Sequence, residues 1–241
     1  MIPTRQLNSL EGKFRPSFSS AEALHNAIST FLIRHLPQWA NDSKYHDQKL
    51  PEDELSNALC LYLDVSARDS LSQVSFINQQ RQGNRHSADM GIRPGSINGI
   101  NIGSRYCHRD EPLAVIEAKR LPTPGTGRHR EYVIGDSGSK SGGIERFKEQ
   151  LHGKEMPKAY MFGYIQEKLN EGSWINQVNN WISEVSSNVV PGMHAPWSDA
   201  DHLQENNHLT NDRLQVLTSE HVRIDQSSIA LWHGWIDLCK S

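Results

Sequence analysis

A charged pair that directly follows an apolar run is the feature that most constrains the fold of this chain. Leu113-Ala114-Val115-Ile116 is a compact apolar run typical of a buried β-strand, and Glu117-Ala118-Lys119 continues it. Because side chains alternate along a strand, Glu117 and Lys119 point to one face of the sheet and Ala118 to the other. Unpaired charges on a buried strand are costly, so the fold has to bring partners to this face.

The composition is that of a polar globular protein with enough apolar residues to fill a core. Of 241 residues, 36% are apolar and 22% are charged, and the mean hydropathy is -0.63. This length fits one domain of ordinary to large size, or two small ones. The three cysteines, Cys60, Cys107 and Cys239, are widely spaced and form no CxxC pair. This spacing excludes a disulfide scaffold and a thiolate zinc site, and it is typical of a reducing cytoplasm.

Basic charge is concentrated in the middle of the chain. Residues 105–165 carry 11 basic and 8 acidic side chains, whereas residues 1–104 carry 10 of each and residues 166–241 carry 4 basic and 10 acidic. The net charge of -3 excludes a polycation that coats nucleic acid. The basic centre predicts either a localised contact with a polyanion or no more than an uneven distribution of solvated charge.

The sequence carries no signal for a membrane. No apolar run approaches the roughly 18 residues that a membrane span needs. The first residues lack the apolar segment of a signal peptide. We therefore expect a cytoplasmic protein that does not associate with a membrane.

Hydrophobic periodicity and turn signals predict a mixed α/β fold. Ser19-Ser20-Ala21-Glu22 is a capping box that opens an apolar helix, and Pro37 is expected to stop that helix. Pro51, followed by three acidic residues, marks the start of a second helix. The remaining predicted elements are strands over 74–77, 88–92 and 113–116, a helix over 144–151 that ends at Gly153, a strand over 159–165, a helix over 174–185, and strands over 214–217 and 229–232.

Two carboxylates and an ammonium group that meet at one place have a clear chemical use. Asp89 lies on a short predicted strand, and Glu117 and Lys119 follow a buried one. The carboxylates could hold Mg²⁺ or Mn²⁺, and such an ion lowers the pKa of a bound water and neutralises a phosphodiester under attack. Lys119 could orient or deprotonate that water, and Glu54 on the upstream helix could complete the metal shell.

This constellation resembles the PD-(D/E)XK nuclease superfamily. The matching residues are Asp89, Glu117, Ala118 and Lys119, with Glu54 in the position of the helix acid that many members use. The chain departs from the pattern at Ala88, where no proline precedes the aspartate. The resemblance covers about residues 51–165 and implies a restriction-endonuclease-like mixed β-sheet flanked by helices. We expect residues 1–48 to form an N-terminal helical extension and residues 49–241 to form the nuclease-like domain.

The resemblance also implies roles for residues beyond the motif. In several branches of the superfamily, the helix after the active site carries a glutamine or a basic residue that faces the metal. Here that helix begins near Gly142-Gly143, and Gln150 and Lys148 are the candidates. Arg120, Arg128 and Arg130, like Lys148, are basic residues that could contact backbone phosphates, although a solvated loop is the alternative for this segment.

The expected activity is metal-dependent hydrolysis of phosphodiester bonds, with DNA as the expected substrate and RNA left open. The resemblance implies an effector of restriction, phage defence or repair that works with a sensor, a motor, a second protein subunit or a second copy of itself. The alternative is a catalytically silent subunit that keeps the fold and binds nucleic acid or assembles with partners. Outside this site, His221 and His233 lie in or beside terminal strands and are predicted to be structural histidines with satisfied hydrogen bonds.

Overall fold

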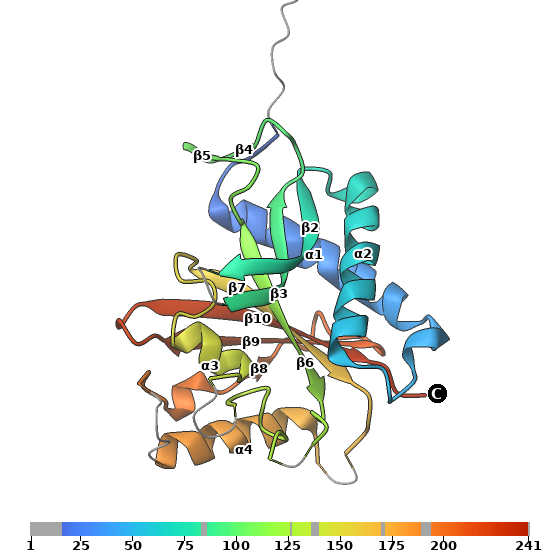
Figure 1. Ribbon diagram of the computed structural model, residues 1–241, viewed down its shortest axis with the longest axis vertical. Helices are drawn as coiled ribbons and strands as arrows, with labels where there is room; N and C mark the ends of the chain where they lie inside the picture. Colours follow the sequence, from blue (N-terminus) through green and yellow to red (C-terminus); the bar gives the residue numbers. More distant parts are fainter. Residues whose placement is uncertain are drawn as a thin grey trace, which may run out of the picture.

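A mixed seven-stranded sheet forms the centre of the protein in the computed structural model (Figure 1). The structure describes residues 16–82, 86–125, 127–135, 140–169, 172–188 and 194–240, so the N-terminal residues that bear on a signal peptide lie outside it. The strands are β2 (Val74–Gln82), β3 (His86–Pro94), β6 (Ala114–Leu121), β7 (Lys158–Ile165), β8 (Gln204–Glu205), β9 (Leu214–Val222) and β10 (Ser228–Asp237). Their order is β2-β3-β6-β7-β10-β9-β8, which confirms the predicted α/β class with a mixed sheet.

Helices cover both faces of this sheet. The helices are α1 (Ala21–Ala40), α2 (Glu52–Ser70), α3 (Gly143–Lys148) and α4 (Trp174–Ser187). One apolar cluster joins α1 and α2 to one face of the sheet, and a second joins α3 and α4 to the other face. A small sheet of β1 (Ser17–Phe18), β4 (Ile100–Ile102) and β5 (Arg105–Cys107) lies beside the first residues of α1. No helix among the described residues is long and apolar enough to cross a membrane.

The first helix continues past the proline that was expected to stop it. Ser20 caps its start, because the Ser20 hydroxyl accepts a hydrogen bond from the Ala23 amide at 3.1 Å. Pro37 lies inside the helix, which runs on to Ala40. Trp39 beyond the proline is only 2% exposed. The prediction was wrong because burying this aromatic side chain outweighs the helical hydrogen bond that proline removes.

Helix α2 begins at Glu52, one residue after the predicted Pro51 signal. Pro51 occupies the N-cap position, and three acidic residues fill the first turn, where they suit the positive end of the helix dipole. Leu59 and Leu63 of α2 lie in the same apolar cluster as Leu32 of α1. The predicted boundary between residues 48 and 49 therefore does not separate two cores.

Two predicted strands extend further than their apolar residues. β2 reaches Gln82 because its polar half still pairs with β3, with Gln80 opposite Ala88 and Gln82 opposite His86. β6 continues through the charged residues to Leu121, since it pairs with β7 as far as that residue. β6 lies between β3 and β7, so the Glu117-Ala118-Lys119 segment lies inside the sheet and not at its edge.

Candidate active site

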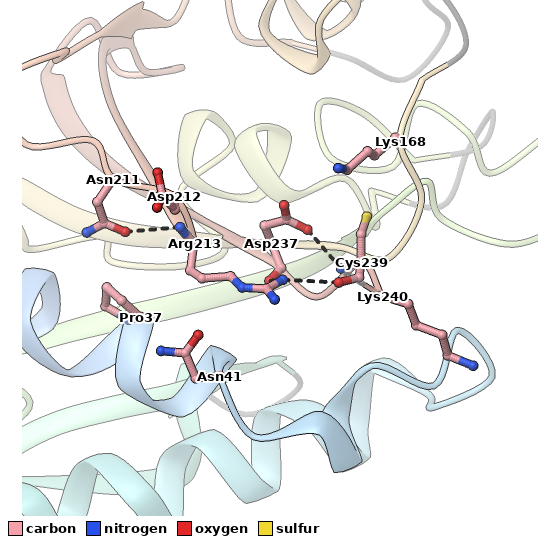
Figure 2. Close-up of a pocket in the computed structure, with 9 residues that line it drawn as sticks. All are labelled: Pro37, Asn41, Lys168, Asn211, Asp212, Arg213, Asp237, Cys239 and Lys240. Atoms are coloured by element: carbon pink, nitrogen blue, oxygen red, sulfur yellow. Dashed lines mark hydrogen bonds between the residues drawn. The ribbon is translucent and has the colours of Figure 1, made fainter.

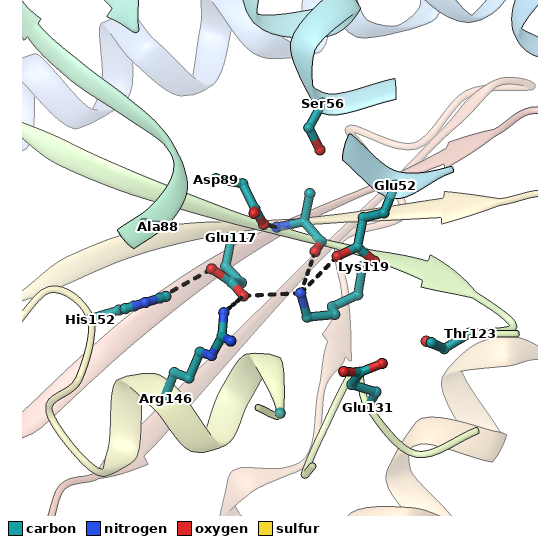
Figure 3. Close-up of polar contacts among 12 residues, drawn as sticks. Glu52, Ser56, Ala88, Asp89, Glu117, Lys119, Thr123, Glu131, Arg146 and His152 are labelled. Carbon is teal, nitrogen blue, oxygen red and sulfur yellow. Dashed lines mark hydrogen bonds and ion pairs between the residues drawn. The ribbon is translucent and has the colours of Figure 1, made fainter. Parts of the chain in front are cut away.

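The charged pair of β6 is buried on the face of the sheet that α3 covers. Glu117 is 0% exposed and Lys119 is 4% exposed. The Lys119 Nζ atom lies 3.0 Å from Glu117 Oε1 (Figure 3). Exposed pairs of this kind contribute little, but a buried pair fixes both side chains, because each charge would be costly without the other.

Lys119 is a fixed positive charge. Its Nζ atom also donates to Glu52 Oε1 and to the carbonyl oxygen of Ala118, each at 2.9 Å. Burial alone would lower the pKa of Lys119, but Glu117, Glu52 and Asp89 outweigh burial and raise this pKa above its usual range. A lysine held in this way can orient groups and stabilise negative charge.

The acid that α2 brings to this centre is Glu52, and the predicted Glu54 lies outside the contacts of the centre. Glu52 accepts from Lys119 through Oε1 and from the Arg120 amide, at 3.0 Å, through Oε2. Glu54 lies two positions further along the helix and is exposed, beside Tyr45 and Leu61. Both acids follow Pro51 in the sequence, and only the docking angle of α2 on the sheet decides which one faces Lys119.

Asp89 joins the centre from β3, as predicted. Its Oδ2 atom accepts a hydrogen bond from the Ala118 amide at 2.7 Å. Burial, followed by the neighbouring Glu117 charge, raises the pKa of Asp89 to about 7. Asp89 therefore exchanges its proton near neutral pH, and a nearby cation would favour its charged form.

Two further residues contact Glu117, and sequence analysis missed both. Arg146 of α3 donates from Nη1 to Glu117 Oε1 at 2.5 Å, and His152 Nδ1 lies 3.1 Å from Glu117 Oε2 (Figure 3). Burial tends to raise the pKa of Glu117, but Lys119, His152 and Arg146 outweigh it and hold this pKa well below its usual range. The ionised form of Glu117 is thus favoured at neutral pH.

Unmet hydrogen-bonding capacity is concentrated around Glu117. Glu117 Oε2, Arg146 Nε and both ring nitrogens of His152 are buried without a hydrogen-bond partner in the described part of the chain. The His152–Glu117 contact is short enough for an ion pair, but its direction is poor for a hydrogen bond. Buried polar atoms are nearly always paired in folded proteins, so this group is suited to a further polar ligand.

The carboxylates fit a divalent cation of the kind the sequence predicts. Among the described residues, no group of three or more His, Cys, Asp or Glu side chains forms a metal site on its own. Mg²⁺ is commonly bound by one or two carboxylates together with water and substrate oxygens. Asp89 and Glu117 supply two carboxylates for such an ion, and His152 is the group that lies beside Glu117 Oε2.

A pair of glycines allows α3 to approach this centre. A Cβ atom on Gly142 would lie 2.2 Å from Ile134 Cα. A Cβ atom on Gly143 would lie 2.5 Å from the Met161 side chain and 3.5 Å from Lys119 Cγ. The first contact is with backbone and cannot relax easily, so the start of α3 can pack against residues 131–134 and β6 only because these side chains are absent.

The two residues predicted on the helix after the motif do not face Glu117. Helix α3 ends at Lys148, and Gln150 follows it in a left-handed conformation with a φ of 58°. This turn directs the Gln150 side chain to Asp225, with which it forms a hydrogen bond. Lys148, predicted to contact nucleic acid, is 0% exposed and pairs with Asp201 at 2.5 Å, so it presents no charge at the surface.

Residues Lys148 and Asp201 belong to a second buried polar group, which we call the polar chain. Its members are Lys148, Asp201, His221, Ser219, His233 and Tyr132. Successive members are joined by side-chain contacts of 2.5 to 2.8 Å, and Trp235 Nε1 donates to the Tyr132 hydroxyl at 2.8 Å. His221 and His233 therefore have the satisfied hydrogen bonds that the sequence predicts for structural histidines.

The three predicted phosphate-binding arginines differ in their freedom to contact a ligand. Arg120 is partly buried and donates from Nη2 to the Gln48 carbonyl oxygen at 2.6 Å. Arg128 is exposed and pairs with Glu131 at 2.6 Å. Arg130 has the loosest pairing, at 3.4 Å from Glu184. Arg128 and Arg130 can reach a polyanion, whereas Arg120 holds the end of β6 in place.

Comparisons of this chain with protein families, with curated proteins and with solved structures found no match. The resemblance to the PD-(D/E)XK superfamily therefore depends on the motif residues and on the order of the elements predicted from the sequence.

Proposed function

We propose that this protein is a divalent-metal-dependent nuclease that hydrolyses phosphodiester bonds, with DNA as its substrate. One observation carries the proposal. Asp89 from β3 and Glu117 and Lys119 from β6 converge on one buried point, and α2 adds Glu52 to it. A sheet that only had to be stable would place apolar residues at these positions, because buried ion pairs seldom add stability over apolar packing.

The side chains have separable roles in this reaction. Asp89 and Glu117 would hold Mg²⁺ or Mn²⁺, which supplies an acidified water and neutralises phosphate charge. Lys119 keeps its proton and stabilises the negative charge that develops on the phosphate. Glu52 is a positioning residue, because it accepts from both Lys119 Nζ and the Arg120 amide and so fixes the lysine relative to β6.

The wider biological role is carried by the family resemblance alone. We infer an effector of restriction, phage defence or repair that acts with a sensor, motor or second subunit, or as an oligomer. Substrate contact would come from Arg128 and Arg130, which lie in the segment between β6 and α3. Contacts of this kind are to backbone phosphate and would tolerate many sequences.

A plasmid-cleavage assay with Mg²⁺ or Mn²⁺ tests the proposal. The Glu117→Gln and Lys119→Met variants should lose about 100-fold to 1,000-fold in rate, and EDTA should abolish cleavage by the wild type. The matched pair Glu52→Gln and Glu54→Gln tests the helix acid: the first should be impaired, and the second should equal the wild type. Equal cleavage by all four variants would overturn the proposal.

The alternative, a silent nuclease-fold subunit, gives a different set of results. Such a protein would cleave nothing, and its melting temperature would not change with Mn²⁺. A nuclease whose activity depends on a partner would also cleave nothing alone, but Mn²⁺ would raise its melting temperature, because the ion binds only the folded state. That rise should be lost in Glu117→Gln.

A further inference from the structure

A cavity of about 490 Å³ lies between the start of α1, the β4–β5 hairpin and the residues just before β7. Apolar side chains supply much of its wall, among them Leu24, Ile102, Leu113 and Met156. Leu24 and Leu113 are buried, and Ile102 and Met156 are half-buried. A concave, mainly apolar site of this size is typical of a small-molecule pocket.

One polar side chain is almost completely buried at this cavity. His25 lines it and is 8% exposed. Its Nδ1 lies 3.1 Å from the Tyr160 hydroxyl, and that hydroxyl donates to the His25 carbonyl oxygen at 3.4 Å. The Tyr160 proton lies on its hydrogen bond to the His25 carbonyl oxygen and is not available to Nδ1. We therefore assign the His25 proton to Nδ1, which donates it to the Tyr160 hydroxyl oxygen.

This assignment makes His25 Nε2 an acceptor. Burial, together with the charge of Lys158, lowers the pKa of His25 to about 4, so the ring is neutral at physiological pH. Within the described ranges no protein group hydrogen-bonds Nε2. Since Nε2 is not among the fully enclosed unpaired atoms, it keeps some access to the cavity that His25 lines.

The charged groups of the cavity disfavour an anion. Glu111 and Glu155 line it, and Arg105 is the cation among its lining residues. Arg105 already pairs with Glu111. Glu155 is exposed and takes part in no ion pair among the described residues. The lining therefore offers acceptors and excess negative charge, and its one cation is already paired. Lys158, whose charge acts on His25, is not among the lining residues.

We propose that this cavity binds a small molecule that has an apolar body and a hydrogen-bond-donating head, with the donor placed on His25 Nε2. The apolar body would lie against Leu24, Ile102, Leu113 and Met156. A neutral or positively charged donor fits the lining, and a negatively charged head does not. This inference is independent of the nuclease proposal, because it shares no residue with the Glu117 centre.

A second cavity has a larger volume, about 620 Å³, but it lacks the features that support a ligand site beside His25. It lies between the end of α1 and the C-terminal residues (Figure 2). Its central Arg213 donates to the carbonyl oxygens of Asp237 and Cys239, at 3.4 and 3.0 Å. Its lining mixes lysines with aspartates, and its one nearly buried side chain with a polar atom, Cys239, already contacts the Ile165 carbonyl oxygen.

Matched ligands test the proposed donor site in the full chain by isothermal titration. Indole donates one N–H, and 1-methylindole has nearly the same body without that donor. We expect the wild type to bind indole about threefold to tenfold more tightly than 1-methylindole. His25→Phe should remove this difference while both compounds still bind. Equal affinities in the wild type, or no binding of either compound up to its solubility limit, would overturn the proposal.

Two further measurements keep the test informative if His25→Phe does not fold. Ile102→Trp fills the cavity from a half-buried position and should abolish binding of both compounds. Tryptamine should bind the wild type more tightly than indole-3-acetate, and Glu155→Gln, at an exposed position, should narrow that gap without changing the ratio of indole to 1-methylindole. Binding that survives Ile102→Trp would place the ligand elsewhere and contradict the proposal.

Discussion

The Glu117 centre and the polar chain are both buried on the same face of the sheet, but their hydrogen bonding differs. In the polar chain, every side chain from Lys148 to Tyr132 has a partner. Around Glu117, four buried polar atoms have no hydrogen-bond partner among the described residues. The polar chain satisfies its hydrogen bonds with its own side chains, whereas the Glu117 centre keeps hydrogen-bonding capacity for a bound ligand.

The direction of each hydrogen bond in the polar chain can be assigned. Trp235 donates to the Tyr132 hydroxyl, which leaves that hydroxyl to donate to His233 Nδ1. Burial lowers the pKa values of His233 and His221, so both rings are neutral. His233 Nε2 then donates to Ser219, Ser219 donates to His221 Nε2, and His221 Nδ1 donates to the ionised Asp201. Each hydroxyl group and each ring nitrogen of the polar chain thus has an assigned partner, as expected of a structural network.

Asp89 shows that the Glu117 centre is held at a cost in stability. Its pKa is raised to about 7, so folding at neutral pH forces a carboxylate into a place that prefers it neutral. Asp201 of the polar chain shows the opposite shift: burial would raise its pKa, but His221 and Lys148 lower it. At neutral pH, the charged form of Asp89 therefore lowers the stability of the fold, whereas the charged form of Asp201 raises it.

Breaking the polar chain should have the largest effect on stability. Asp201→Ala removes the partner of Lys148 and His221 and leaves a buried ammonium without an anion. We expect the free energy of unfolding to fall by about 3–5 kcal/mol, measured by denaturant titration. The matched control is Asp199→Ala in the same short helix, where the side chain is 75% exposed and the change should stay within about 1 kcal/mol. Equal losses in the two variants would mean that the polar chain does not hold the fold together.

Removing the Asp89 charge from the Glu117 centre should change the free energy of unfolding by a smaller amount and in the opposite direction, because stability should rise. Asp89→Asn keeps an acceptor for the Ala118 amide but removes the negative charge of this half-buried side chain. At pH 8 we expect this variant to be about 2 kcal/mol more stable than the wild type, and to lose any nuclease activity.

The pH dependence of the extra stability of Asp89→Asn is the control for this prediction. A raised pKa means that the folded state binds the Asp89 proton more tightly than the unfolded state does. The Asp89 contribution to wild-type stability therefore falls as pH rises from about 4 to about 7. The difference in free energy of unfolding between Asp89→Asn and the wild type should be absent at pH 4 and complete above pH 7. Mn²⁺ should reduce this difference, because it stabilises the wild type alone. A variant that is less stable than the wild type at pH 8 would contradict this account.

The smallest expected effect is that of Arg130→Ala, which separates contact with nucleic acid from catalysis. Arg130 pairs only loosely with Glu184, so Arg130→Ala should leave stability within about 0.5 kcal/mol. DNA binding should weaken by the same factor for different sequences, and the slope of log affinity against log salt should drop by about one. Arg68→Ala on α2, whose arginine pairs with Asp64, serves as the control and should not change the slope. Identical slopes for wild type and Arg130→Ala would exclude this arginine from the contact.

The motif residues on strands were predictable because strand geometry is local. Two-residue alternation places Glu117 and Lys119 on one face whatever the rest of the chain does, and an apolar run before them indicates burial. The structure indeed buries both side chains on one face. The residues that support them were harder to predict, because Glu52, Arg146 and His152 come from three separate segments.

Helix ends account for several of the errors. A helix extended to Gly153 would have carried Gln150 on α3, but α3 ends at Lys148, and a left-handed residue at Gln150 redirects that side chain to Asp225. Pro37 was expected to end α1, yet tertiary burial of Trp39 carries the helix onward. Local propensities at a helix end are worth a few kcal/mol at most, so packing can reverse them.

The sequence by itself determined the mixed α/β class and the central charged strand with Glu117 and Lys119 on one face, since each follows from the spacing of neighbouring residues. Only the tertiary structure decided that Glu52 and not Glu54 contacts Lys119, and that Lys148 pairs with Asp201 inside the protein. Periodicity places a side chain on one face of its own element. The identity of the group opposite depends on how two elements dock, and docking is set by the packing of many residues distant in sequence.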